Sequence, residues 1–160
     1  MTSASPSPAT HGAPPRTAFL LAQLGASAAD RFAERVTALG LSPREAGALR
    51  VLGRTQGLSQ RELAERLGTV PSRLVALIDE LEQRGLVVRS RSEDDRRNNV
   101  LSLAPQGERM LERLREVAEA HQADILAPLG AAEQRMLAGL LTKLAGASDL
   151  SPDGHPGYRA

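Results

Sequence analysis

The 160-residue sequence contains no cysteine and very few aromatic side chains. Without a thiol, the chain cannot form a disulfide framework, a thiolate zinc site or a thiol-based redox sensor. Aromatic residues are 2% of the chain and hydrophobic residues 41%, so the core must consist mainly of Leu, Ala, Val and Ile. No apolar run approaches the roughly 18 residues of a membrane span, and residues 1–15 are too polar and proline-rich for a secretory signal. We therefore expect a cytoplasmic globular protein with no membrane partner.

The features of an enzyme are also missing. His11, His121 and His155 are scattered along the chain, and no glycine-rich phosphate loop is present. His121 occupies an apolar position of a predicted helix, which favours a core or interface histidine over an effector contact or a pH sensor. The carboxylates of residues 108–119 alternate with arginines, as on a solvated helix face. The sequence therefore predicts no enzymatic activity, no cofactor and no metal.

The charge balance gives little support to nucleic-acid binding by itself, because the formal net charge is only +1. Arg supplies all but one of the 20 cationic residues. Arg can bind guanine edges and phosphates through two hydrogen bonds, although codon usage explains the bias equally well.

Start and stop signals divide the chain into helices. Residues 1–16 and 147–160 lack apolar periodicity and are predicted to be disordered tails. Apolar residues at helical spacing predict a helix over about 17–39, and a capping box at residues 42–45 predicts a second helix to about Thr55.

Two further helices follow across a short turn. Ser59 and Glu62 repeat the capping box and open a short helix that stops at Gly68. Pro71 then opens a helix that ends at Gly85. Its apolar stripe consists of Leu74, Leu77, Ile78 and Leu81. A turn of three or four residues between two such helices is the spacing of a helix-turn-helix.

A β-hairpin and two long helices complete the predicted fold. Residues 86–91 and 100–103 have strand composition and flank a polar turn, which predicts a wing directly after the helix-turn-helix. Residues 105–146 contain two helices whose apolar residues exceed what a monomer can bury. The predicted fold class is mainly α with a small β-hairpin wing: a winged helix-turn-helix at about 42–104, with dimerisation helices at about 17–39 and 105–146.

Two segments carry a family resemblance. The stretch LSQRELAERLGTVPSRLVALIDELEQRGLVVRS and the wing EDDRRNNVLSLAPQG resemble the MarR family of bacterial transcriptional regulators over about residues 17–146. The resemblance implies a homodimeric DNA-binding protein on a pseudo-palindromic operator, usually a repressor that a small phenolic or anionic effector releases. One departure is Ala104, where the family usually has a capping Thr, and we expect a looser junction between wing and helix there.

The helix over about 71–84 is predicted to enter the major groove of duplex DNA. Its apolar stripe must face the core, which turns the candidate base readers toward solvent or the flank of the domain: Ser72, Arg73, Val75, Ala76 and Asp79. Arg73 is suited to a guanine or to a phosphate, and Ser72 to either. Val75 and Ala76 are suited to thymine methyl groups, although Val75 could equally flank the core.

Two other groups are expected at the DNA. In the wing, Asp95 is suited to orient Arg97 beside Arg96 for the minor groove, a role that the resemblance also implies; the alternative is a salt-bridged turn. Gln60 and Arg61 lie at the start of a helix, where phosphate binding is favoured.

A different class of function remains open. A winged-helix module that binds another protein would not need Arg73, Arg96 or Arg97, and the near-neutral charge favours it. The operator, the regulated genes, the direction of regulation and the effector cannot be deduced from the sequence. With only two Phe in the folded part, an effector pocket is expected to be aliphatic, with Arg as a partner for an anion.

Overall fold

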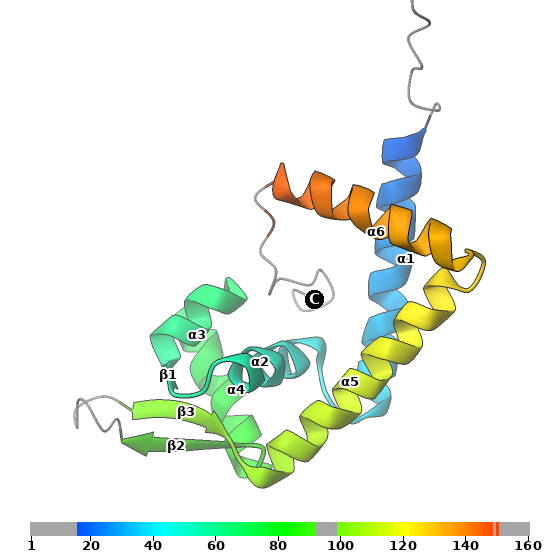
Figure 1. The fold of residues 1–160 in the computed structure, drawn as a ribbon. Coiled ribbons are helices and arrows are strands. Elements are labelled where there is room, and N and C mark those ends of the chain that lie inside the picture. The colour runs from blue at the N-terminus through cyan, green and yellow to red at the C-terminus, as the bar shows by residue number, and fades with distance from the viewer. Residues whose placement is uncertain (1–15, 92–98, 149, 151–160) are drawn as a thin grey trace, which may run out of the picture.

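The computed structural model describes residues 16–91, 99–148 and 150 of the chain. This part has six helices and a small sheet, which lies at one end of the molecule beside α3 and α4, away from α1 and α6 (Figure 1). In chain order the elements are α1 (Thr17–Ala38), α2 (Pro43–Arg54), β1 (Leu58–Ser59), α3 (Gln60–Leu67), α4 (Pro71–Gln83), β2 (Val87–Arg91), β3 (Asn99–Leu103), α5 (Pro105–Leu126) and α6 (Ala131–Gly146). The predicted fold class and helix starts are confirmed. No helix of the described residues is long and apolar enough to cross a membrane.

The sheet contains one strand that the sequence did not predict. Its order is β1-β3-β2, with both pairs antiparallel. Leu58 of β1 lies opposite Leu101 of β3, and Arg89 of β2 lies opposite the same residue. Strand β1 is only two residues long and is defined by its pairing with a segment some forty positions away, which no local pattern reveals.

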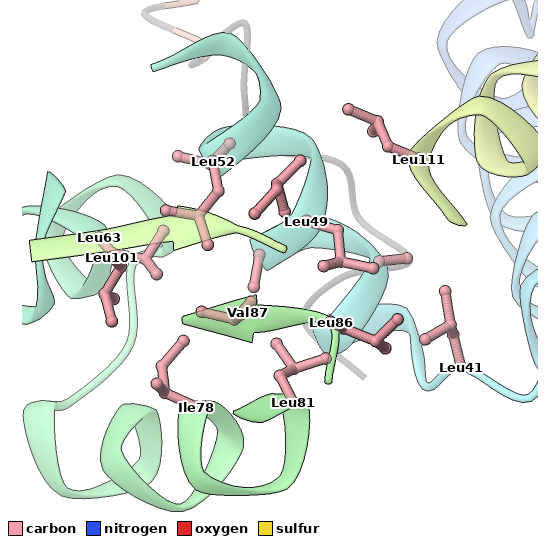
Figure 2. Close-up of a cluster of buried hydrophobic side chains, with 14 of the residues drawn as sticks. Leu41, Leu49, Leu52, Leu63, Ile78, Leu81, Leu86, Val87, Leu101 and Leu111 are labelled. Carbon is pink, nitrogen blue, oxygen red and sulfur yellow. The ribbon is translucent and has the colours of Figure 1, made fainter. Parts of the chain in front are cut away.

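The core fills the space between α2, α3, α4 and the sheet. Figure 2 shows Leu49 and Leu52 of α2, Ile78 of α4, Val87 of β2 and Leu101 of β3 converging there. All five side chains are at most 1% exposed. The winged helix-turn-helix therefore has its own aliphatic core, as the shortage of aromatics required.

An ion pair with a buried carboxylate ties the end of α4 to the start of α2 and to the turn before it. Ser42 caps α2 through the predicted box: its Oγ accepts from the Glu45 N–H at 3.2 Å, and its own N–H donates to Glu45 Oε2 at 2.6 Å. Arg84 Nη1 donates to the other carboxylate oxygen at 2.6 Å, and Nη2 donates to the carbonyl of Gly40 at 2.9 Å. Glu45 is only 6% exposed, so its charge must be paired in this way.

The junction between the wing and α5 is closely packed. Ala104 provides no side-chain cap, as expected, but its N–H donates to the Leu86 carbonyl at 3.0 Å and Pro105 occupies the first helical position. A Cβ on Gly107 would lie 1.9 Å from the same carbonyl oxygen, so the approach requires glycine. These backbone contacts pack the junction closely, but the first N–H groups of α5 still lack a side-chain cap, so the expected looseness stays a prediction.

Candidate nucleic-acid interface

The helix-turn-helix consists of α3 and α4, joined through a left-handed glycine. Ser59 Oγ accepts from the Glu62 N–H at 3.2 Å, and the Ser59 N–H donates to Glu62 Oε2 at 2.8 Å. The Ser59 hydroxyl also donates to Glu62 Oε2 at 2.7 Å, and this hydrogen bond, followed by the one from the Ser59 N–H, lowers the pKa of Glu62. Helix α3 ends at Gly68 with φ of 62°, and Pro71 starts α4. Gly68 and Pro71 thus define the short turn between α3 and α4.

Helix α4 separates a buried face from an exposed one. Leu74, Ile78 and Leu81 are at most 1% exposed and pack into the core. The predicted DNA-facing residues of α4 all lie on its exposed side: Ser72, Arg73, Val75 and Ala76. Val75 is 42% exposed, so it does not flank the core. The N-terminal half of α4 therefore offers a hydroxyl, a guanidinium and two small apolar side chains on one surface.

The two residues predicted at the start of α3 differ in their surroundings. Arg61 is almost fully solvated, with 86% of its side chain exposed, and pairs with Glu65 one turn later at 3.0 Å. Gln60 is half-buried and lies beside Arg89 of the wing. Arg61 thus has the reach of a phosphate ligand, whereas the Gln60 side chain is held beside Arg89.

The wing is described up to its tip. Strands β2 and β3 pair from Val87 with Leu103 to Arg91 with Asn99. Asp95, Arg96 and Arg97 lie outside the described residues, so the predicted wing-tip contact stays a prediction. Arg91 is exposed, whereas Arg89 turns back onto α4, with Nη2 donating to Asp79 and Nη1 to Glu82.

Asp79 lies at the flank of α4, which the sequence allowed, and its side chain is 47% exposed. The sequence placed its side chain among the outward candidates of α4, but its carboxylate is occupied by Arg89. The helical periodicity of α4 places Asp79 beside the apolar stripe. Its partner Arg89 comes from β2 and reaches it only because β2 packs against α4. Arg89 itself was treated as one of several wing charges, and no local signal distinguished it from Arg91.

A pocket of about 440 Å³ lies between α1, α2 and α5, away from the exposed face of α4. Aliphatic and arginine side chains dominate its lining, which includes Phe32, Arg50, Arg54, Leu111, Arg115 and His121. The composition agrees with the aliphatic, arginine-bearing pocket expected from the sequence.

His121 gives this pocket an unused polar atom. Its ring lies 5.5 Å from that of Phe32, and its Nδ1 is buried with no hydrogen-bond partner among the described residues. Burial, and then the charges of Arg35 and Arg31, lower the pKa of His121, so the neutral form is favoured at pH 7. The sequence predicted a satisfied core or interface histidine; His121 is half-buried at the wall of the pocket, and the interface alternative stays a prediction.

The fold and the exposed face of α4 define a winged helix-turn-helix DNA-binding protein. The family model of the MarR family matches residues 39–98. A putative transcriptional regulatory protein for the hcr operon of Thauera aromatica is 36% identical over 115 residues, which are 71% of this chain and 69% of the relative. The HTH-type transcriptional repressor Rv2887 of Mycobacterium tuberculosis is 32% identical over 126 residues, or 79% of this chain and 91% of the relative. The chain belongs to the MarR family of transcriptional regulators.

Solved structures agree with this assignment. The Rv2887 complex with DNA has a TM-score of 0.69 at 29% identity and covers 83% of this chain and 98% of its own. The same protein with p-aminosalicylic acid has a TM-score of 0.66 at 30% identity, covering 81% and 98%. The repressor CouR, bound to a 23-mer DNA duplex, has a TM-score of 0.67 at 31% identity, covering 81% and 92%.

Proposed function

We propose that this protein is a transcriptional repressor that binds a pseudo-palindromic operator as a homodimer, with α4 of each subunit in a major groove. The exposed row Ser72, Arg73, Val75 and Ala76 at the start of α4 carries the proposal. A guanidinium there can donate to N7 and O6 of one guanine, and the small apolar side chains fit thymine methyl groups. Arg61 is placed to bind the phosphate backbone, and Asp95 with Arg96 and Arg97 would serve the minor groove.

The test is a binding measurement on selected DNA. Duplexes are enriched from a random pool by the wild-type protein, and binding is measured by fluorescence anisotropy against a scrambled duplex. Arg73→Ala should weaken specific binding by roughly ten- to a hundredfold and relax the preference at one base pair. Arg97→Ala should weaken binding as well, with less preference for a narrow A·T minor groove.

Arg113→Ala is the matched control, because Arg113 is exposed on α5 away from the proposed surface. It should bind as the wild type does. If no sequence is enriched over the scrambled duplex, a protein-binding module becomes the better explanation. Equal losses in Arg73→Ala and Arg113→Ala would contradict the assignment of α4.

We further propose that an organic anion in the pocket between α2 and α5 releases the DNA. The Arg side chains of the pocket suit a carboxylate, and the open Nδ1 of His121 offers a further polar contact. Salicylate is the probe, because a relative was solved with p-aminosalicylic acid. It should raise the melting temperature and lower operator affinity, and Ala118→Phe, which fills the pocket, should abolish both effects. A panel of aromatic and aliphatic carboxylates that leaves both readouts unchanged would contradict the proposal.

A further inference from the structure

Arg89 lies in the wing, yet its side chain is turned away from solvent and toward α4. Its Nη2 donates to Asp79 Oδ1 and its Nη1 to Glu82 Oε2, and only 23% of the side chain is exposed. Asp79 and Glu82 are three residues apart, so they lie on the same side of the helix. One planar guanidinium can therefore bind both carboxylates at once.

This pairing favours the charged form of Arg89. The hydrogen bond that Arg89 donates to Asp79, together with the charge of Glu82, outweighs the partial burial of the guanidinium and raises the pKa of Arg89. The two carboxylates are themselves partly exposed, at 47% and 39%. They could carry full negative charge toward solvent if Arg89 were absent.

That charge would matter at DNA. The major groove is about 12 Å wide, and the Debye length at physiological salt is about 8 Å. Any carboxylate on a helix inside the groove is thus incompletely screened from the phosphates. Arg89 pairs with two of the three carboxylates of α4, Asp79 and Glu82, while Glu80 is exposed.

Gln60 is a third partner. Rotating its side-chain amide by 180° would turn the oxygen toward the wing, where it would accept from Arg89 Nε at 3.1 Å and from Nη2 at 3.2 Å. This orientation commits the oxygen and leaves the two N–H donors of the amide for an acceptor elsewhere. Because Gln60 begins α3, those donors lie at the helix end where phosphate binding is favoured.

We propose that Arg89 is a positioning residue for operator binding: without contacting DNA, it neutralises Asp79 and Glu82 on α4 and orients the amide of Gln60. The inference rests on the proposed function, since it concerns the same DNA surface. Arg89 would thus support DNA binding from within a cluster with Asp79, Glu82 and Gln60. It would not be one of the exposed arginines that contact phosphates directly.

The experiment compares the wild type, Arg89→Gln, the double variant Asp79→Asn/Glu82→Gln, and the triple variant that combines all three changes. Operator affinity is measured by anisotropy from low to high salt, with melting temperatures in parallel. Arg91→Gln is the control, since Arg91 is exposed on the same strand. We expect Arg89→Gln to lose about tenfold in affinity at low salt and less at high salt, because salt screens the uncovered carboxylates. The triple variant should recover to within about threefold of the wild type.

Other outcomes overturn the inference. A triple variant as weak as Arg89→Gln would show that the uncovered carboxylates do not cause the loss, and would overturn the neutralising role of Arg89. A loss that does not change with salt and follows the melting temperature would mean that Arg89 only stabilises the fold. Wild-type affinity in Arg89→Gln would remove any role. If the wild type itself binds no selected duplex, both the proposed function and this inference fail. In every other outcome the wild type binds DNA and only the role of Arg89 is in question.

Discussion

At the scale of single residues, Gly107 sets the distance between α5 and the wing. Its substitution by Ala would place a methyl group 1.9 Å from the Leu86 carbonyl oxygen and 2.9 Å from its carbon, both backbone atoms that cannot turn aside. We expect Gly107→Ala to lower the free energy of unfolding by roughly 1–3 kcal/mol through overpacking. Urea denaturation measures this. Gly146→Ala, at a position with no atom within 4 Å of the added Cβ, should change stability by less than about 0.5 kcal/mol.

The low pKa of His121 predicts a pH dependence of stability. Its folded-state pKa lies below the ordinary value of 6.5, so the unfolded chain binds the proton more tightly. Above pH 6.5, the titration of His121 therefore does not change the free energy of unfolding. As the pH falls from 6.5 toward the folded-state pKa, the free energy of unfolding decreases. The facing charges of Arg31 and Arg35 favour this loss, while Asp124 opposes it.

The prediction is a difference between two proteins. Melting temperatures measured from pH 8 to pH 5 should fall more steeply for the wild type than for His121→Gln, because the carboxylates that titrate in that range are common to both. Parallel curves for the two proteins would show that His121 is protonated equally in the folded and unfolded chain.

At the scale of elements, local chemistry predicted most boundaries. The hydroxyls of Ser42 and Ser59 accept hydrogen bonds from backbone N–H groups at a helix start, and Pro71 fits a first helical position where no N–H is needed. The structure places the starts of α2, α3 and α4 at these residues. Strand β1 and the partners of Arg89 were not predictable in this way. Both depend on segments that only the tertiary fold brings together, and a charged residue on a strand carries no sign of where its guanidinium turns.

The two capping boxes allow a matched test of the helix-turn-helix. Ser59→Ala and Ser42→Ala each remove a hydroxyl that accepts from an N–H at 3.2 Å, and each should cost about 1 kcal/mol of stability. Only Ser59 starts the helix that carries Gln60 and Arg61. We therefore expect similar falls in melting temperature but weaker operator binding in Ser59→Ala alone. Equal operator affinities for the two variants would contradict a role for the start of α3 at DNA.

At the scale of the whole molecule, α5 links the two parts of the fold. It starts against the wing at Leu86 and Gly107, runs along the pocket and leads into α6 (Figure 1). Arg84 ties α4 to the turn between α1 and α2 in the same way. A ligand in the pocket would therefore contact two helices that hold the DNA-binding part in place. These are α5, which packs on the wing, and α2, whose Glu45 pairs with Arg84. It would shift the spacing of two recognition helices only to the extent that it binds one arrangement more tightly than another.

The remaining feature at this scale is the apolar surface of α1 and α6. Phe19, Leu20 and Leu24 of α1 are 53–65% exposed, and α6 has no buried residue at all. Leu140 and Leu144 of α6 are 56% and 55% exposed. A monomer rarely leaves such contiguous apolar faces in water, so we expect a second copy of the chain to cover them. Recognition helices on a two-fold dimer would then lie about 34 Å apart, one turn of DNA.

Sedimentation equilibrium at micromolar concentration should give twice the 17.0 kDa mass of one chain. Leu140→Asp/Leu144→Asp should sediment as a monomer, because two carboxylates would have to be desolvated in the interface. It should also lose operator affinity by more than about a hundredfold, since each half-site would be bound alone. Thr142→Asp, an exposed position on the polar side of α6, should remain dimeric and bind normally. A wild type that sediments as one chain would contradict the dimer, and a monomeric double variant with full operator affinity would separate DNA binding from dimerisation.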